Sequence, residues 1–307
     1  MASYKLATYQ TADGPRAGLV LTDRVFDAEQ LTGRPSYATV LGILEDWQNA
    51  TGLLQEAAAK AGRAGKGQPL QQTAFRAPVL WPSAIYCAGA NYSDHAAEMA
   101  VRANRPPEPD PKSLGLKPWH FIKASRSLAD PGATVSASRY TKKLDWEVEL
   151  AAVIGKPARN VSVEKALEHV AGYTAANDLS ARDLSRRPHI SDTSAFKSDW
   201  TGQKSFDGAC PLGPWIVPAQ EIPDPQDLAI KLWVNDVLKQ DSHTGKMIFS
   251  IAEQIAHLSS GMTLHPGDVI LTGTPAGVGS ARNEFLQAGD VVKIEIGRIG
   301  ILINKIA

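Results

Sequence analysis

Two segments of the chain are apolar on both faces and carry acidic residues. Residues 144–155 contain Glu147 and Glu149 among Leu, Val, Ala and Ile, and residues 170–177 are followed by Asp178. A short run that is apolar on both faces is typical of a buried strand, whose successive side chains point to opposite faces. We therefore expect Glu147 and Glu149 to project from one face of a buried strand, close to each other. The alternative is an edge strand whose polar face meets water.

The remaining pattern mixes strands with short helices. Turn-bounded strand patterns occupy residues 17–21, 24–27, 230–235, 269–272 and 291–296, and helical spacing occupies residues 37–46, 47–61, 94–101 and 248–259. Because no strand–helix unit repeats, we predict an α+β fold with a rolled, mainly antiparallel sheet. A glycine-rich stretch at 62–67 predicts a boundary between a small N-terminal α+β domain, residues 1–75, and a main domain, residues 76–307.

Composition narrows the range of functions. The 307 residues are 43% hydrophobic and 21% charged, as in a globular protein with a large core. Lys plus Arg equals Asp plus Glu, at 32 each, so no net charge favours nucleic acid or an anionic membrane. No run reaches membrane-spanning length and no apolar signal core is visible, so we expect a cytoplasmic protein. Cys87 and Cys210 are expected to be buried free thiols.

Three carboxylates are expected to converge. Crowded carboxylates beside a core repel each other and lose hydration, so a cation must compensate. Asp178 ends a strand pattern, and residues 179–184 resemble the start of a helix, which is a common place for an active site; the alternative is that Asp178 only caps that helix. A set of three carboxylates favours Mg²⁺ or Mn²⁺, with Ca²⁺ as a substitute, over Zn²⁺. We therefore predict a metal site at Glu147, Glu149 and Asp178.

Helical spacing pairs a histidine with a glutamate. His95 and Glu98 are three residues apart within the helical pattern, so their side chains share one face. A carboxylate beside an imidazole fixes its tautomer and raises its basicity, which suits a general base near neutral pH. On an ordinary surface helix the same pair is only a weak ion pair. The proline-rich stretch at 105–111 follows, and it forms either a lid or a passive loop.

Three further side chains are candidates for contact with the substrate. Lys204 lies among Trp, Phe and Gly residues, which favours contact with a developing oxyanion over the usual solvated lysine. Arg182, one turn into the expected helix after Asp178, would hold a carboxylate in a bidentate fork, unless it is a surface arginine. Thr274, in the turn at 272–275, would offer exposed donors to a carboxylate, although a plain turn explains the same residues.

Five motifs in order carry a resemblance to a known family. They are the stretch Asn91-Tyr92-Ser93-Asp94-His95-Ala96-Ala97-Glu98, the Glu147–Glu149 strand, Asn177-Asp178-Leu179-Ser180-Ala181-Arg182-Asp183, Lys204-Ser205-Phe206-Asp207, and Leu271-Thr272-Gly273-Thr274-Pro275. From about Pro82 to the C-terminus, the chain resembles the fumarylacetoacetate hydrolase superfamily, in its branch of acylpyruvate hydrolases and 2-hydroxyhepta-2,4-diene-1,7-dioate isomerases. The resemblance implies a β-roll of mixed strands and a homodimer. It also favours Lys204 over Lys197 and assigns Tyr92 to the substrate site.

The resemblance implies a metal-dependent enzyme acting on a small keto acid. We predict a hydrolase that cleaves a C–C bond in a 1,3-diketo acid such as an acylpyruvate or fumarylpyruvate. The His95–Glu98 pair would activate water, and Lys204 would stabilise the oxyanion. An isomerase or decarboxylase of a 2-keto or 2-hydroxydiene dicarboxylate is the alternative, followed by a dehydratase or aldolase. A metal-binding scaffold without activity is disfavoured, because it has no use for the His–Glu pair. One departure is Ser185, where many acylpyruvate-cleaving relatives carry a longer amide-bearing residue.

Overall fold

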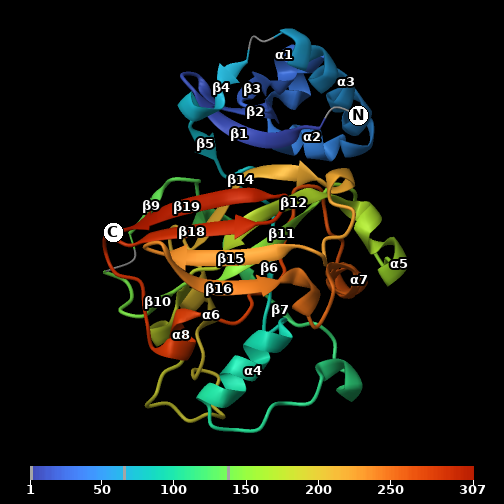
Figure 1. Ribbon diagram of the computed structural model, residues 1–307. Coiled ribbons are helices and arrows are strands. Elements are labelled where there is room, and N and C mark those ends of the chain that lie inside the picture. Colours follow the sequence, from blue (N-terminus) through green and yellow to red (C-terminus); the bar gives the residue numbers. More distant parts are fainter. Residues whose placement is uncertain (1–2, 65–66, 137–138) are drawn as a thin grey trace.

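A 12-stranded mixed sheet runs through most of the molecule (Figure 1). The computed structural model describes residues 3–64, 67–136 and 139–307. Neighbouring strands are antiparallel except for the pairs β17–β6 and β14–β8. The path of the sheet is β4 (Gln68–Pro69), β3 (Arg24–Asp27), β2 (Gly14–Leu21), β1 (Lys5–Thr11), β14 (Cys210–Pro218), β12 (Val170–Asn177), β11 (Val148–Ile154), β17 (Val269–Leu271), β6 (Ile85–Ala88) and β7 (His120–Lys123), with β5 (Phe75–Arg76) paired to β1 and β8 (Leu128–Ala129) paired to β14.

A 5-stranded sheet packs against the centre of the long sheet. Its order is β16 (Val237–His243), β15 (Ala229–Val234), β18 (Val291–Ile296), β19 (Gly300–Ile306) and β9 (Thr134–Val135). Strands β15, β18 and β19 bury alternate residues, whereas β11 and β12 are buried along their whole length. Alternation indicates one face on the core, and continuous burial indicates cover on both faces. The predicted α+β fold with mixed, mainly antiparallel strands is confirmed.

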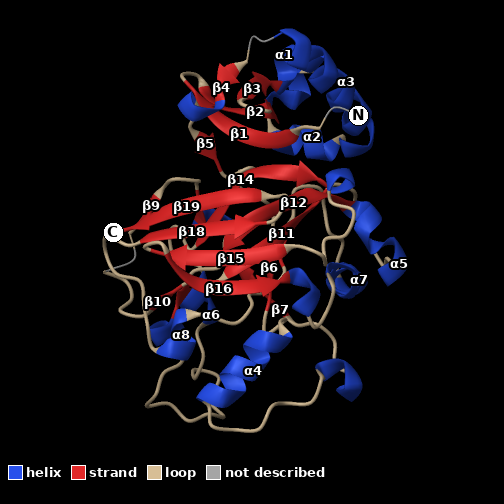
Figure 2. Cartoon of the chain, viewed as in Figure 1, coloured by secondary structure: helices blue, strands red, loops and turns tan. Residues whose placement is uncertain are grey.

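Helices cover the ends and sides of these sheets (Figure 2). Helix α7 begins with a capping box, in which Ser250 and Glu253 exchange side-chain and backbone hydrogen bonds. The helices predicted at 47–61, 94–101 and 248–259 are confirmed as α3, α4 and α7. The α-helices are α1 (Ala28–Thr32), α2 (Val40–Glu45), α3 (Trp47–Ala64), α4 (Ser93–Arg102), α5 (Val163–Ala166), α6 (Trp200–Lys204), α7 (Ile251–Gly261) and α8 (Gly279–Arg282). The 3-10 helices are η1 (Pro35–Ala38), η2 (Leu70–Gln72), η3 (Pro111–Leu114), η4 (Ser125–Ser127), η5 (Leu167–His169), η6 (Arg182–Leu184), η7 (Ala219–Glu221) and η8 (Thr244–Lys246).

The N-terminal part, drawn in blue in Figure 1, is joined to the rest by backbone pairing and by a common core. Leu6 of β1 pairs with Ile216 of β14. One buried cluster contains Leu6 and Ile43 from the N-terminal part together with Val153 and Cys210 from the main part. The boundary at residue 75 stays a prediction, and residues 65–66 of the expected linker lie outside the described ranges.

Two local expectations are wrong. The strand expected at 144–155 is interrupted, because side-chain oxygens of Asp145 and Asn177 accept the backbone N–H groups of Trp146 and Glu147 at 2.9 and 3.0 Å. The helix expected at 179–184 is replaced by strand β13 (Ser180–Ala181), which pairs with β10 (Leu144–Asp145), and by η6. Tertiary pairing overrides the local helical pattern here.

Candidate active site

Three carboxylates meet beside the paired ends of β11 and β12. Glu149 lies in β11, Glu147 precedes that strand, and Asp178 directly follows β12. The N–H of Asp178 donates to the carbonyl of Glu147 at 2.9 Å, which fixes the two chain segments side by side. One oxygen from each of the three side chains lies within 4.8 Å of the others, and all three residues are buried. The structure thus brings together the three predicted metal ligands, although Glu147 and Glu149 do not share an unbroken strand.

Lys204, at the end of α6, bridges two of these carboxylates. Its Nζ atom donates to Oε2 of Glu147 at 2.8 Å and to Oδ2 of Asp178 at 2.6 Å. Burial lowers the pKa of Lys204, but the charges of Asp178 and Glu147 outweigh it, so that the pKa rises above its ordinary value. The amine therefore stays charged at neutral pH. The competing Lys197 instead donates to the carbonyl of Ile190, at 2.8 Å.

A second buried lysine, Lys123, was not among the residues predicted from the sequence. Its Nζ atom donates to Oδ1 of Asp178 at 2.6 Å and to the carbonyl of Leu179 at 3.2 Å. Lys123 ends β7, where side chains alternate, so Phe121 and Lys123 share one face of the strand. In the sequence, the one feature that could have indicated Lys123 is its place at the end of the apolar pair Phe121-Ile122, and its position next to Asp178 is visible only in the fold.

Arg182 is engaged by carboxylates of the protein itself. Its Nε donates to Asp145 Oδ2 at 2.8 Å, and its NH2 group donates to Glu147. The charge of Glu147, followed by that of Asp145, outweighs burial and raises the pKa of Arg182. The expected helical path from Asp178 to Arg182 is wrong, and in this structure the guanidinium fork is occupied. Binding of a substrate carboxylate by Arg182 stays a prediction that requires these pairs to rearrange.

Glu149 carries the uncompensated charge of the cluster. Its Oε2 accepts a 2.6 Å hydrogen bond from the N–H of Gly273, and it forms no ion pair with any residue in the described ranges. Burial, followed by the charges of Asp178 and Glu147, raises the pKa of Glu149 well above its ordinary range. Gly273 adopts φ 98°, and a Cβ there would lie 2.8 Å from Cβ of Asn91, so this close backbone contact requires glycine.

The donor set fits a hard divalent cation. With all four carboxylates ionised, the hydrogen-bonded cluster has a formal balance of one negative charge against its three cationic side chains; the carboxylates are Asp145, Glu147, Glu149 and Asp178, and the cations are Lys123, Lys204 and Arg182. The three converging ligand atoms are all carboxylate oxygens, which suit Mg²⁺, Mn²⁺ or Ca²⁺. A cation beside Glu149 would remove the electrostatic cost that raises its pKa.

The His95–Glu98 pair lies on α4 and is tied to the carboxylate cluster through the turn after β17. His95 Nδ1 is 3.5 Å from Glu98 Oε2, and this nitrogen makes no hydrogen bond within the described part of the chain. The N–H of Gly277 donates to both oxygens of Glu98 at 3.0 Å, while the N–H of Gly273 donates to Glu149. One turn therefore holds the glutamate of the pair at one end and a predicted metal ligand at the other.

Two residues assigned to substrate binding are buried. The hydroxyl of Tyr92 has no hydrogen-bond partner within the described ranges, and burial, followed by the charges of Glu149 and Asp94, raises its pKa. The hydroxyl of Thr274 accepts a 3.0 Å hydrogen bond from Gln240. The expectation of exposed donors at 272–275 is wrong, because Thr272 and Thr274 are buried and the N–H of Gly273 is taken by Glu149. A role for Tyr92 and Thr274 in substrate binding stays a prediction.

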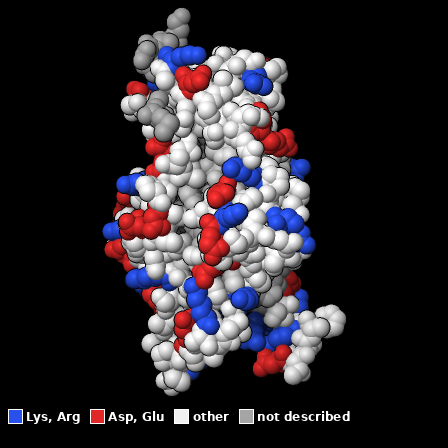
Figure 3. Space-filling view, turned by 90° about the vertical axis from the view of Figure 1, so that its right-hand side faces the viewer, with Lys and Arg blue, Asp and Glu red and all other residues white. Residues whose placement is uncertain are grey.

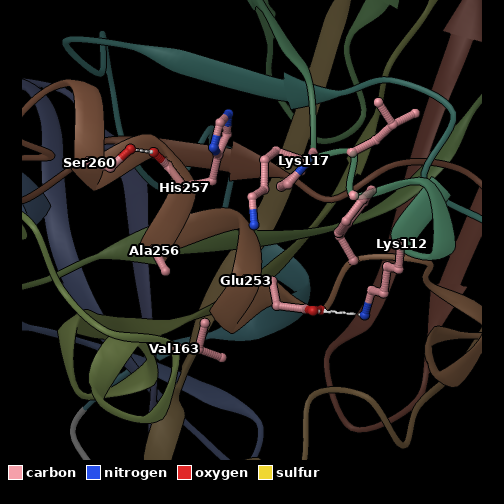
Figure 4. Close-up of a pocket in the computed structure, with 11 residues that line it drawn as sticks. Lys112, Lys117, Val163, Glu253, Ala256, His257 and Ser260 are labelled. Atoms are coloured by element: carbon pink, nitrogen blue, oxygen red, sulfur yellow. Dashed lines mark hydrogen bonds and ion pairs between the residues drawn. The ribbon is translucent and has the colours of Figure 1, made fainter.

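A separate open cavity of about 470 Å³ lies between α7 and the segment around η3 (Figure 4). Its lining includes His257 and Lys112, and Lys112 pairs with Glu253 at 2.8 Å. None of the clustered carboxylates lines this cavity.

Figure 3 shows acidic and basic side chains interspersed on one face of the molecule, in agreement with the balanced composition. None of the helices in the described ranges combines the length and apolar character that crossing a bilayer requires.

Comparisons with known proteins agree with this arrangement. The family model described as fumarylacetoacetate (FAA) hydrolase C-terminal matches residues 84–307. The human protein named oxaloacetate tautomerase FAHD2B, mitochondrial, is 42% identical over 241 residues, which cover 78% of this chain and 71% of that protein. The solved structure of maleylpyruvate hydrolase from Sphingobium sp. SYK-6, in complex with manganese (II) ion and pyruvate, is 30% identical, with a TM-score of 0.73 over 99% of this chain and 98% of that chain. That of 5-carboxymethyl-2-hydroxymuconate delta-isomerase from Mycobacterium smegmatis is 30% identical, with a TM-score of 0.71 over 99% of both chains.

Proposed function

Because the chain belongs to the fumarylacetoacetate hydrolase family, we propose that it is a metal-dependent enzyme that stabilises the enolate of a small 2-keto acid. The observation that carries the proposal is the buried carboxylate cluster, which is ion-paired with two lysines and is linked to a His–Glu pair through the turn at 273–277. Proteins named for tautomerase, isomerase and hydrolase activities share this family, and each of these reactions has an enolate on its path.

We assign metal binding to the three carboxylates and stabilisation of negative charge to Lys204. Glu147, Glu149 and Asp178 would hold Mg²⁺ or Mn²⁺, with Ca²⁺ as a substitute, and the ion would supply a Lewis acid for the keto oxygen. With a divalent ion the net charge of the cluster becomes positive, which suits an anionic substrate. Lys204 brings charged N–H donors to the same place, where they would stabilise developing negative charge.

His95 is the proposed proton carrier. Glu98 lies beside its Nδ1 atom and is itself held by Gly277, so the carboxylate can orient the ring. In a tautomerase or isomerase, His95 would move a proton between carbon and oxygen of the substrate. In a hydrolase, Nε2 of His95, the ring nitrogen that does not face Glu98, would take a proton from the attacking water.

Keto–enol tautomerisation of an oxaloacetate-like acid is our first candidate reaction. The relative named oxaloacetate tautomerase is 42% identical, whereas the maleylpyruvate hydrolase is 30% identical. C–C hydrolysis of a 1,3-diketo acid, the first choice from the sequence alone, becomes the second candidate. It is favoured by the likeness to a hydrolase solved with manganese and pyruvate over nearly the whole chain, and disfavoured by Ser185. Decarboxylation remains the third.

One pair of assays separates these reactions. Enol oxaloacetate is added to the Mn²⁺-loaded protein, and loss of enol absorbance is followed with and without excess EDTA; acylpyruvates are tested in parallel for pyruvate release. We expect metal-dependent ketonisation that is lost in the chelated protein. Faster pyruvate release than ketonisation would make hydrolysis the function. Absence of both reactions in protein that binds Mn²⁺ would contradict the proposal.

Two further expectations concern the protein in the cell. A homodimer is implied by the family resemblance, and a stable monomer in light scattering at micromolar concentration would count against it. The cytoplasmic location also stays a prediction, since several relatives are named as mitochondrial proteins.

A further inference from the structure

Three aromatic side chains run from the carboxylate cluster to the surface. The ring of Phe121 lies 5.1 Å from Nζ of Lys204. The ring of Trp200 stacks on Phe121 at 5.2 Å and 29°, and it meets Trp119 edge-on at 5.4 Å and 73°. Trp119 and Phe121 are 6.0 Å apart. We call these three residues the aromatic wall.

Two elements that position the buried lysines also position the wall. On β7, alternation puts Phe121 on the same face as Lys123, whose amine binds Asp178. On α6, Trp200 and Lys204 are four residues apart and therefore share one helix face. Phe121 and Trp200 thus lie on the strand and the helix whose lysines bind Asp178, and Trp119 directly precedes that strand.

Two of the three side chains in the aromatic wall are partly exposed to solvent. Trp119 and Trp200 are 45% and 46% exposed. Half-exposed indoles leave apolar surface in water, and such surface commonly marks a binding site. Trp119 is nevertheless fixed, because its ring packs on Gly89 so closely that a Cβ there would lie 2.0 Å from the ring. Gly89 begins the turn that leads to α4, which carries His95.

The chemistry of the wall selects a planar, uncharged group. Its rings offer π faces and two indole N–H groups that donate no hydrogen bond within the described part of the chain. A conjugated or aromatic substituent would stack on these faces. A carboxylate there would meet the negative faces of the rings, and the cations beside the wall are already bound to Glu147 and Asp178.

We propose that the aromatic wall is a specificity-determining subsite that binds a planar, uncharged substituent of the keto acid. This inference rests on the proposed function for the position of the keto-acid end, and it adds the substituent that this chain's own residues select. We therefore expect the enzyme to accept keto acids with a conjugated or aryl group beyond the keto acid, in addition to the oxaloacetate-like acid of the first candidate reaction.

Binding of two non-enolisable probes tests the subsite without turnover. Calorimetry compares phenylglyoxylate with trimethylpyruvate on the Mn²⁺-loaded protein; both probes carry a keto acid that cannot enolise, and only the first carries a planar ring. We expect phenylglyoxylate to bind about tenfold tighter or better, and Trp200→Ala to remove most of that difference while trimethylpyruvate affinity changes less than about twofold. Trp119→Ala should act in the same direction. Trp233→Ala is the matched control, since Trp233 lies on the 5-stranded sheet under Lys293.

Each outcome bears on the proposal separately. Equal affinity of both probes for the wild-type protein, or an unchanged preference in Trp119→Ala and Trp200→Ala, would overturn the subsite. Conversion of a dimer to a monomer in these variants, with the preference intact, would show that the wall is instead covered by a second copy of the chain. A clear preference in a protein that turns over no keto acid would support the subsite and refute the proposed function.

Discussion

The ammonium group of Lys123 lies 2.6 Å from one oxygen of Asp178, and both side chains are buried. Lys204 takes the other oxygen of the same carboxylate, also at 2.6 Å. Asp178 is therefore clamped between two ammonium groups that come from β7 and α6. This clamp fixes one of the three proposed metal ligands through residues that are far away in the sequence.

Replacing Lys123 tests the clamp. Lys123→Met keeps the length of the side chain but leaves Asp178 with one cation fewer. We expect the free energy of unfolding, measured in urea with EDTA, to fall by about 3–5 kcal/mol, as when one partner of a buried ion pair is removed. Mn²⁺ should restore part of this loss, because the ion supplies positive charge to the same carboxylate.

The control for this measurement is Lys231→Met. Lys231 pairs with Asp241 at 3.4 Å, and both side chains are more than one third exposed. A change of less than about 1 kcal/mol is expected there. Wild-type stability of Lys123→Met in EDTA would show that the clamp contributes nothing.

Removing Glu149 should abolish metal binding. In Glu149→Ala the two remaining carboxylates, Glu147 and Asp178, are already paired with Lys204. A divalent ion would then have to displace the ammonium group of Lys204 from these two carboxylates, and Glu149, the ligand without an ion-pair partner, would be missing. Calorimetric titration with Mn²⁺ should show no binding and the assays no turnover. Glu164→Ala, at a residue exposed in α5, is the control, and unchanged Mn²⁺ affinity in Glu149→Ala would refute the site.

The family motifs were sufficient to predict the convergence of Glu147, Glu149 and Asp178, although the unbroken strand assumed for the two glutamates is wrong because Glu147 precedes β11. The sequence was also sufficient for α4, whose spacing places His95 beside Glu98. It could not reveal the interruption at Trp146, since the oxygens that accept the backbone N–H groups come from side chains in the folded state. The expected helix after Asp178 failed because pairing with β10 was not visible locally.

The ion-pair partners of the cationic residues were the features of the site least predictable from the sequence. Lys123 comes from a strand that is 55 positions away from Asp178, and nothing in its neighbours indicates that partner. Arg182 was recognised as a site residue, yet its partners depend on the fold, which presents Asp145 and Glu147 to its guanidinium before any substrate does. Long-range charge pairing of this kind requires the three-dimensional structure.

The free energy of unfolding should depend on pH through Asp94, which lies in the first turn of α4. Burial raises the pKa of Asp94, but hydrogen bonds from Ser242, Lys246 and the N–H of Ala276 outweigh it, so the pKa is lowered. A carboxyl whose pKa is lower in the folded state adds stability above its unfolded pKa, near 3.9, and loses it as the pH falls through the folded value. Asp94→Asn should therefore be less stable than wild type at pH 7, with the difference shrinking below about pH 4 in urea titrations. A difference independent of pH would contradict this assignment.

The segment from Tyr92 to Lys117 should order over a bound ligand. Among the described residues, its far end is held by the Lys112–Glu253 ion pair at 2.8 Å, and both of those side chains are partly exposed. Residues 101–110 and 112–117 are exposed, so this part of the segment has few buried contacts, which allows local opening. Hydrogen exchange of backbone amides in 92–117 should slow when oxalate is added to the Mn²⁺-loaded protein, while β11 stays unchanged. Equal protection with and without oxalate would exclude a lid.

His95 should matter for proton transfer and not for metal binding. It lies on α4, the three carboxylates already supply a sufficient set of hard ligands, and Glu98 is held by Gly277 in a position to orient the ring. General-base assistance contributes about 10²–10⁴-fold in rate, so His95→Ala and Glu98→Ala should lose turnover on that scale while keeping wild-type Mn²⁺ affinity in calorimetry. If hydrolysis is the reaction, pyruvate release should fall in both variants, whereas exchange of substrate protons into deuterated solvent should partly survive. If tautomerisation is the reaction, proton exchange should fall together with ketonisation, because the same nitrogen carries the proton. Near-wild-type turnover in His95→Ala would remove the pair from the mechanism and leave the metal and Lys204 to carry the chemistry.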